Sequence, residues 1–167
     1  MSTGAPIDTK KVAGRREVRY GTLDDALADV EALVAAGPVR ALGNWTAAMN
    51  VQHVAFPIGF AVDGYPPEAA KTPFLVKTMM RLMKNRVLEK GFGPGIKPPP
   101  DIAKTFAPDP DVTMDAALEL FRANLAAARQ RGMAQPNPLL GRLTPDEYER
   151  FNCRHAELHF SFIVPAG

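Results

Sequence analysis

TPDEYERFNCRHAELHFSF, residues 144–162, is the stretch that decides the fold, because it predicts one helix carrying two of the chain's three histidines. Thr144 can cap this helix, Pro145 suits its first turn, and Glu147 completes a capping box three residues after the cap. Its apolar residues recur at the spacing of a helix face that points into a bundle: Tyr148, Phe151, His155, Leu158 and Phe162. The sequence therefore predicts a long helix with histidine on its inward side.

His155 and His159 are four residues apart, so they lie one above the other on the helix surface. Side chains at this spacing have Cβ atoms about 5–6 Å apart, which allows two imidazoles to bind one metal ion. The same spacing also occurs in core histidines that only hydrogen-bond to their neighbours. The pair alone leaves both interpretations open.

The length of the chain indicates a single domain, and its charge composition indicates a protein that does not bind nucleic acid. The chain has 167 residues, and Lys plus Arg exceed Asp plus Glu by 20 to 18, which gives no strong positive field. The single Cys153 excludes an intramolecular disulfide, and the basic amino terminus lacks the apolar run of an export signal. We expect a flexible tail over residues 1–14, a single domain over 15–167, a cytoplasmic location and no membrane contact.

Helical periodicity recurs along the rest of the chain, without a convincing strand. The expected helices span residues 22–36, 44–63, 73–90, 113–131 and 144–162. The one at 73–90 is basic, which we interpret as a solvated face, and its apolar residues lie on one side: Phe74, Leu75, Met79, Leu82, Met83 and Val87. Residues 91–111 contain six prolines and are expected to form an irregular strap over one end of the molecule. These elements predict an all-α helical bundle.

The third histidine, His53, falls on the inward stripe of the helix expected at 44–63. Pro57 lacks an N–H group and leaves the carbonyl of His53 without its usual helical partner, so we expect a local bend there. Helices in a bundle pack about 8–10 Å apart, which would allow His53 to meet His155 and His159. Three imidazoles would leave coordination positions open, as in a catalytic metal site.

Two segments resemble a known family. GNWTAAMNVQHVA (43–55) and RHAELHFSF (154–162) are similar to the two histidine-bearing helices of the DinB-like (DinB/YfiT) four-helix-bundle superfamily. Together with DG (63–64) and LTPDEY (143–148), they resemble a branch of it known only as a domain of unknown function. The resemblance implies a bundle with one long crossover, which would contain the extra basic helix and the proline-rich strap. It also implies a nickel or zinc ion bound by His53, His155 and His159.

Four further residues are candidates for the site. Gln52 neighbours His53, and Asn152 shares a stripe with the histidine pair, so either could orient a metal ligand or a water. Tyr148 could reach the pocket with its hydroxyl, although packing against Leu143 at the helix start also explains it. Trp45 would anchor the core at the start of its helix.

Two other features have simpler interpretations. Cys153 lies about 200° around the helix from His155 and should point away from the site, so we do not expect a nucleophile. Arg154 and Glu157 are three residues apart, and we expect them to pair on the outer face.

The sequence thus supports two functions of different classes. The first is an enzyme whose divalent metal (nickel, zinc or iron) activates water or an external low-molecular-weight thiol for transfer to, or hydrolysis of, a small molecule. Thiols such as bacillithiol, mycothiol or glutathione are used by relatives in the superfamily. The alternative is a non-catalytic metal-binding or structural bundle, which would form a homodimer through an apolar helix face.

Overall fold

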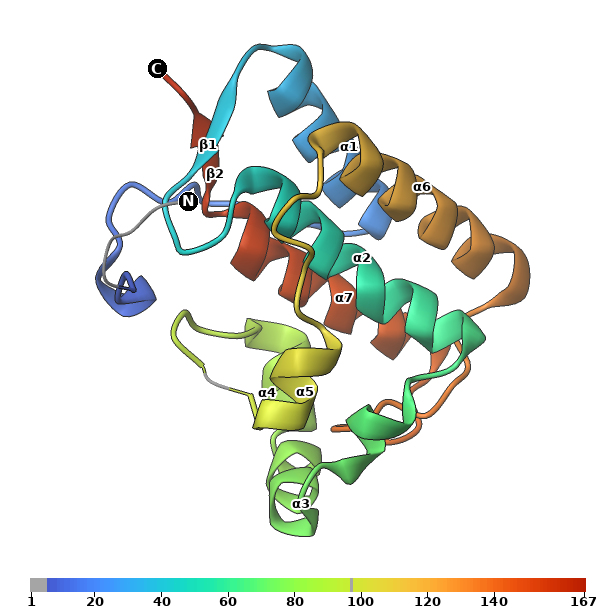
Figure 1. Ribbon diagram of the computed structural model, residues 1–167. Helices are drawn as coiled ribbons and strands as arrows, with labels where there is room; N and C mark the ends of the chain where they lie inside the picture. Colours follow the sequence, from blue (N-terminus) through green and yellow to red (C-terminus); the bar gives the residue numbers. More distant parts are fainter. Residues whose placement is uncertain (1–5, 97) are drawn as a thin grey trace.

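The computed structural model describes residues 6–96 and 98–167 and is mostly helical, as expected for an all-α protein (Figure 1). Four helices form the main body: α1 (Leu23–Ala35), α2 (Ala47–Asp63), α6 (Met114–Arg131) and α7 (Pro145–Phe160). Helices α1 and α2 each pack against both α6 and α7, which closes the four into a bundle. The predicted helix 144–162 is confirmed as α7.

Each of the four long helices begins at a threonine whose hydroxyl accepts a backbone N–H in the first turn: Thr22, Thr46, Thr113 and Thr144. The expected capping box of Thr144 and Glu147 is present. Helix α2 begins at Ala47 and not at Asn44 as we expected, because Thr46 takes the capping position. Its helical assignment continues through Pro57 to Asp63.

Small and aromatic side chains fill the core between these helices. Val51, Val54 and Ile58 of α2 are fully buried, as are Phe121 of α6 and Phe160 of α7. An alanine-rich α6 and the glycine at position 59 allow α2 and α6 to approach closely. Helices α2 and α7, which carry the histidines, also contact each other and share this core.

A two-stranded antiparallel sheet, which we did not expect, joins β1 (Val39–Ala41) to β2 (Ile163–Pro165). Arg40 pairs with Val164 at its centre. Three-residue strands are too short to show an alternating pattern, so periodicity could not reveal them. The sheet fixes the end of α7 beside the chain that leads into α2 (Figure 1).

The crossover between α2 and α6 differs from our expectation. It contains a 3-10 turn (Pro67–Lys71), α3 (Phe74–Leu82), α4 (Lys84–Lys90) and α5 (Pro100–Thr105). The single helix expected at 73–90 is divided at Met83, and part of the strap is helical because Pro100 occupies a first-turn position, where proline is tolerated.

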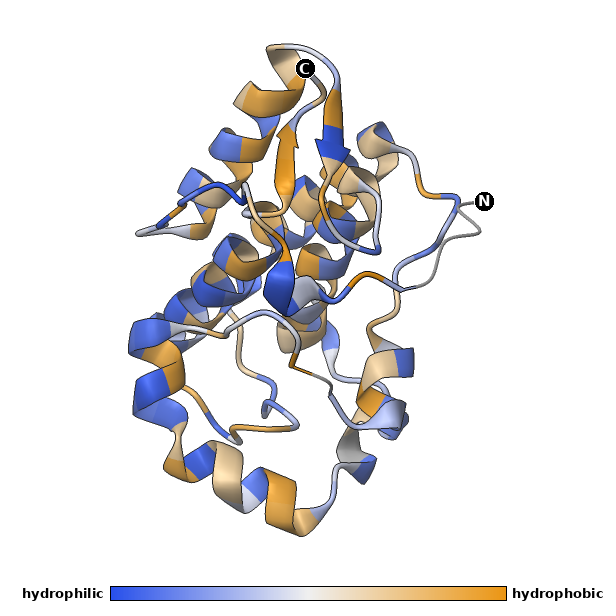
Figure 2. Cartoon of the chain, turned by 90° about the vertical axis from the view of Figure 1, so that its left-hand side faces the viewer, coloured by the Kyte–Doolittle hydropathy of each residue, from blue (hydrophilic) through white to orange (hydrophobic). Residues whose placement is uncertain are grey.

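The apolar side of α3 is not buried. Phe74, Leu75 and Leu82 are 80%, 79% and 83% exposed, and none of the residues of α3 is buried. In Figure 2 the lowest helix, α3, carries both hydrophobic and hydrophilic positions along its length. Helix α4 does bury Val87 and Leu88, which pack with Leu140 and Phe151. The apolar stripe of the sequence therefore splits between an exposed helix and a packed one.

The amino-terminal segment lies against the body of the protein from residue 6 onward. Ile7 exchanges two hydrogen bonds with the side chain of Asn44, and a 3-10 turn spans Thr9–Lys11. Residues 15–20 form no strand, and Tyr20 is buried. Residues 1–5 of the predicted tail lie outside the described residues, and its flexibility stays a prediction. In the described part of the chain, none of the helices has the length and apolar character needed to cross a membrane.

Candidate metal centre

The fold brings the three histidines together. His53 comes from the middle of α2, and His155 and His159 come from the last two turns of α7. One ring nitrogen of each lies within 4.8 Å of the others, and Nε2 of His53 is 3.2 Å from Nε2 of His155. All three side chains remain partly accessible to solvent. The juxtaposition expected from the sequence is therefore present.

The protonation of His53 is fixed by the chain that follows α5. Its Nδ1 lies 2.6 Å from the carbonyl oxygen of Phe106. Since a carbonyl only accepts hydrogen bonds, Nδ1 must carry the proton and donate it. The neutral ring then presents a lone pair at Nε2, the atom that faces His155.

His159 is oriented in the same way by Asn50, one turn before His53 on α2. The Asn50 amide nitrogen donates to the carbonyl of Thr46 at 2.9 Å, which turns its oxygen Oδ1 toward His159. That oxygen is 3.2 Å from Nδ1 of His159, so this nitrogen also carries the proton. His53 and His159 thus both keep Nε2 free as a lone-pair donor, the form in which histidine binds metals.

His155 has an unsatisfied nitrogen. Its Nδ1 is buried and has no hydrogen-bond partner within residues 6–96 and 98–167. If its proton is on Nε2, that group can donate to His53, and Nδ1 is a buried lone pair without a donor. If its proton is on Nδ1, two lone pairs face each other at 3.2 Å. A cation between the two Nε2 atoms would remove that repulsion.

Donor type and spacing fit a divalent ion. Zinc binds imidazole nitrogen at about 2.0–2.1 Å, so two nitrogens of one tetrahedral ion lie about 3.3 Å apart. The measured 3.2 Å between His53 and His155 agrees with that value. The chemistry of three imidazoles suits zinc, nickel or iron, whereas magnesium and calcium prefer oxygen ligands.

Trp45 forms an aromatic wall beside the histidines. Its indole stacks on His159 with ring centroids 5.5 Å apart and 16° between the planes, and its centroid is 4.7 Å from that of His53. Trp45 is only partly buried, so it is not the core anchor we expected. It instead limits the orientations of two of the three rings.

Burial keeps the three imidazoles neutral. Desolvation lowers the pKa of His53 from 6.5 to about 4, against a smaller opposing effect of the Phe106 carbonyl. Desolvation also lowers the pKa of His155 and of His159, with further lowering by the neighbouring rings. The neutral forms, each of which has one ring nitrogen with a lone pair, are therefore favoured at neutral pH.

The other candidate residues have different partners. Gln52 accepts a hydrogen bond from the backbone N–H of Asp109 at 2.7 Å and so holds the strap. Tyr148 donates to the carbonyl of Gln135. Asn152 is buried and donates to the carbonyl of Tyr148. Sequence reasoning missed Asn50 and Phe106, although Asn50 lies three residues before His53 on the same helix.

Arg154 and Glu157 form the expected pair, at 2.8 Å, but not on an outer face. Arg154 is 5% exposed and also donates to the carbonyl of Tyr20 at 2.5 Å. The extended segment before α1 covers this side of α7, which the helical period alone could not show. Cys153 is fully buried, and desolvation raises the pKa of its thiol to about 12.

Two surface pockets, of about 310 and 500 Å³, lie beside α7, and neither is lined by any of the three histidines. Both include Arg19 and Arg154. The histidine cluster is therefore separate from these pockets, with Trp45 and Phe106 against its rings.

Comparison with known proteins identifies the family. A family model matches residues 12–166, nearly the whole chain. The chain belongs to the family described as "Protein of unknown function (DUF1569)". Membership of a family of unknown function was expected from the sequence. No curated protein and no solved structure matches the chain.

Proposed function

We propose that His53, His155 and His159 bind one divalent metal ion and that this DUF1569 member is a metal-dependent enzyme acting on a small molecule. The observation that carries the proposal is the convergence of the three rings, two of which hold their protons on Nδ1 and leave Nε2 free. Nickel, zinc and iron all accept such ligands.

We also assign the family to the DinB-like superfamily. Two observations support this assignment. Helices α1 and α2 each contact both α6 and α7, and one histidine lies on α2 and two on α7. The long crossover between α2 and α6 agrees with the same architecture.

A metal held by three histidines supplies a Lewis acid that lowers the pKa of water or of a thiol, or polarises a carbonyl. The chain's own part is to hold the ligands. The carbonyl of Phe106 and the amide of Asn50 fix the tautomers of His53 and His159, and Trp45 restricts their rings. The reaction we favour is transfer to, or hydrolysis of, a small electrophilic substrate.

The chain's own thiol is not suited to act as the nucleophile. The one thiol, Cys153, is fully buried and has its pKa raised to about 12, so it is neither accessible nor ionised at neutral pH. We therefore propose a water molecule or an external low-molecular-weight thiol as the attacking group.

A non-catalytic metal-binding or structural role is the second candidate. It is favoured by the two surface pockets, neither of which reaches a histidine. Metal-loaded protein that binds no thiol and converts neither chromogenic esters nor electrophilic arenes, with or without glutathione, would support this role.

Measuring the metal content tests metal binding, the step on which the proposed enzyme depends. We would purify the protein without a histidine tag, reconstitute it with nickel, zinc and iron in turn, and measure bound metal by elemental mass spectrometry. Wild type should hold near one equivalent, and His53→Ala and His155→Ala should hold almost none. Asn50→Ala should retain the metal with about 10- to 100-fold lower affinity, because only the support of His159 is lost.

Cys153→Ala is the matched control, since it alters the same helix and removes the only thiol. It should bind metal as wild type does. Wild-type protein that binds no metal after reconstitution, or a His155→Ala variant that binds it normally, would overturn the proposal.

A further inference from the structure

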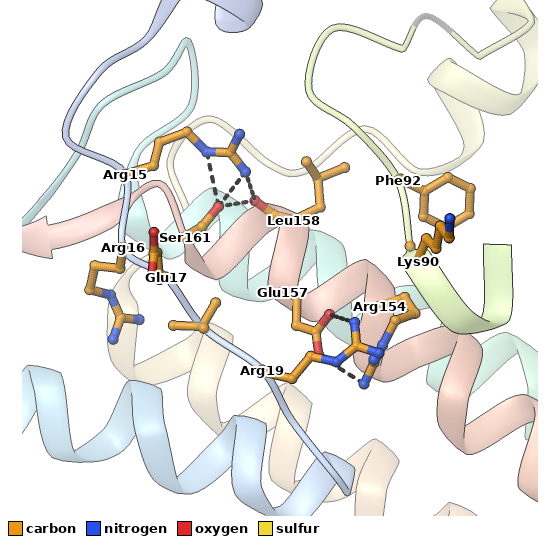
Figure 3. A pocket seen from close by; sticks show the side chains of 12 residues that line it. Arg15, Arg16, Glu17, Arg19, Lys90, Phe92, Arg154, Glu157, Leu158 and Ser161 are labelled. Atoms are coloured by element: carbon orange, nitrogen blue, oxygen red, sulfur yellow. Dashed lines mark hydrogen bonds and ion pairs between the residues drawn. The ribbon is translucent and has the colours of Figure 1, made fainter. Parts of the chain in front are cut away.

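The 310 Å³ pocket beside α7 is built from three separate segments (Figure 3). Its lining comes from residues 15–19, from residues 90–92 where α4 leads into the strap, and from four residues at the carboxyl end of α7 and just after it: Arg154, Glu157, Leu158 and Ser161. Figure 3 shows Arg15 on one side and Lys90 and Phe92 on the other, with Leu158 on the helix between them. Its volume is at the lower end of the range for small-molecule sites.

Positive charge is in excess in this pocket. Five cationic side chains line it, Arg15, Arg16, Arg19, Lys90 and Arg154, against the two carboxylates Glu17 and Glu157. Arg16 donates two hydrogen bonds to the carboxylate of Asp29, which neutralises its charge. Glu157 forms ion pairs with both Arg19 and Arg154. Among the residues that the structure describes, Arg15 and Lys90 have no carboxylate partner.

Arg15 is held in place with one edge free. Its Nε and Nη2 donate to Oγ of Ser161 at 3.1 and 2.6 Å, and its guanidinium carbon lies 4.3 Å from the ring centroid of Phe162. Nη1 makes no hydrogen bond to the described residues. A guanidinium fixed on one side offers its other donors to a carboxylate or phosphate at a low cost in entropy.

Arg154 provides a second, independent indication. It is 5% exposed, lines the pocket, and its Nε is buried without a hydrogen-bond partner. Its one carboxylate partner, Glu157, is also bonded to Arg19. One carboxylate therefore faces two guanidinium groups, and the remaining positive charge would stabilise an additional anion nearby.

The apolar lining suggests what the anion is attached to. Phe92 and Leu158 are both partly accessible in the pocket. We propose that this pocket binds a small organic anion, whose carboxylate or phosphate contacts Arg15 and Lys90 while its apolar body lies between Phe92 and Leu158. This inference goes beyond the proposed function because the site contains no metal ligand.

The pocket is nevertheless a neighbour of the metal centre. Ser161 and Phe162, which hold Arg15, follow His159 by two and three residues, just past the end of α7. Arg15 is close enough for its charge to contribute to the lowered pKa of His159. A ligand anchored at Arg15 would therefore extend beside the last turn of α7.

Three probes of similar shape test the inference: phenylacetate, phenyl phosphate and the neutral phenylacetamide. Each is titrated into ¹⁵N-labelled full-length protein at low ionic strength, and chemical-shift changes give the Kd. We expect one or both anions to shift residues 15–19, 90–92 and 154–161, and phenylacetamide to bind at least tenfold more weakly. The two anions distinguish a carboxylate site from a phosphate site.

Arg15→Gln keeps a planar polar group but removes the charge and should weaken anion binding at least tenfold. Arg122→Gln is the matched control, because Arg122 is an exposed arginine paired with Glu31 outside the pocket, and its Kd should equal that of wild type. The ¹⁵N spectrum of each variant verifies its fold.

Binding should also persist in metal-free His155→Ala, so failure of the metal site and failure of this pocket can be told apart. Equal affinity for phenylacetate and phenylacetamide, or an unchanged Kd in a folded Arg15→Gln variant, would overturn the proposal. So would the absence of any shift in the three lining segments.

Discussion

At the scale of single residues, the proposed metal centre depends on which nitrogen of His53 and of His159 carries the proton. The carbonyl of Phe106 and the amide oxygen of Asn50 both accept from an Nδ1, and this choice directs an Nε2 lone pair of His53 and of His159 inward. The same burial that positions the rings disfavours their charged forms. The metal binding that we propose and the acid sensitivity that we predict therefore have one physical cause, the burial of the rings.

This cause predicts a pH dependence of stability in the metal-free protein. The pKa of His53 is lowered from 6.5 to about 4, so between these values the unfolded chain binds more protons than the folded one. The free energy of unfolding must then fall as the pH decreases from about 6.5 to about 4. His53 alone should account for a loss on the order of 3 kcal/mol.

Urea unfolding of chelator-treated wild type and His53→Gln at pH 8, 7, 6 and 5 measures this effect. Carboxylates titrate alike in both proteins, so the difference between the two curves isolates His53. The curves should run parallel from pH 8 to 7 and converge or cross below 6.5, as wild type loses stability faster. Parallel curves down to pH 5 would show that His53 is not desolvated in solution.

The sequence predicts the histidines better than it predicts the groups that orient them. Helical spacing places His53, His155 and His159 on inward faces, because it depends only on the period of the helix. Asn50 lies one turn from His53 on α2, but its role requires the rotamer that Thr46 imposes. Phe106 contributes a backbone carbonyl, which every residue has, so no residue type could reveal it.

At the scale of elements, periodicity identifies a helix without showing what covers it. The apolar stripe expected at 73–90 is present, yet the part on α3 is exposed while Val87 and Leu88 of α4 pack against α7. The difference is set by the break at Met83 and by the direction of the crossover, which are tertiary features. β1 and β2 were missed for a related reason, since each forms only by pairing with the other.

Two leucines in this region give a matched comparison. Leu82 of α3 is 83% exposed and Leu88 of α4 is 4% exposed. Leu88→Ala should lower the free energy of unfolding by about 2–5 kcal/mol, because it leaves a cavity beside Phe151. Leu82→Ala should change it by no more than about 0.5 kcal/mol.

Urea unfolding at micromolar protein, with sedimentation velocity in parallel, checks both variants. A large loss for Leu82→Ala would mean that the face of α3 is covered in solution. If sedimentation also showed a wild-type dimer that dissociates in this variant, the homodimer expected from the sequence would be located at α3.

At the scale of the whole molecule, the crossover returns to the helix from which it departs. After leaving α2 at Asp63, the chain forms α3, α4 and α5 and then crosses α2 again at Gln52 and His53. Gln52 accepts from the N–H of Asp109, and His53 donates to the carbonyl of Phe106. Two adjacent residues of α2 thus hold the end of the strap, and one of them is a proposed metal ligand.

This arrangement predicts that the strap and the metal centre are coupled. Gln52→Ala removes one of the two attachments and leaves all three histidines intact, so the Phe106 carbonyl should be less well fixed over His53. We expect metal affinity to fall about tenfold, within the range for groups that support ligands, and amide hydrogen exchange to accelerate over residues 106–109. By reciprocity, adding metal to wild type should slow exchange in the same segment.

Gln130→Ala is the control, since Gln130 is exposed on α6 and its loss should change neither quantity. Faster exchange in Gln52→Ala at unchanged metal affinity would show that the strap only covers α2. Unchanged exchange would show that the Gln52 hydrogen bond does not hold the strap. Lower affinity together with faster exchange would make the crossover a part of the metal centre, because its backbone supplies the acceptor that fixes the tautomer of His53.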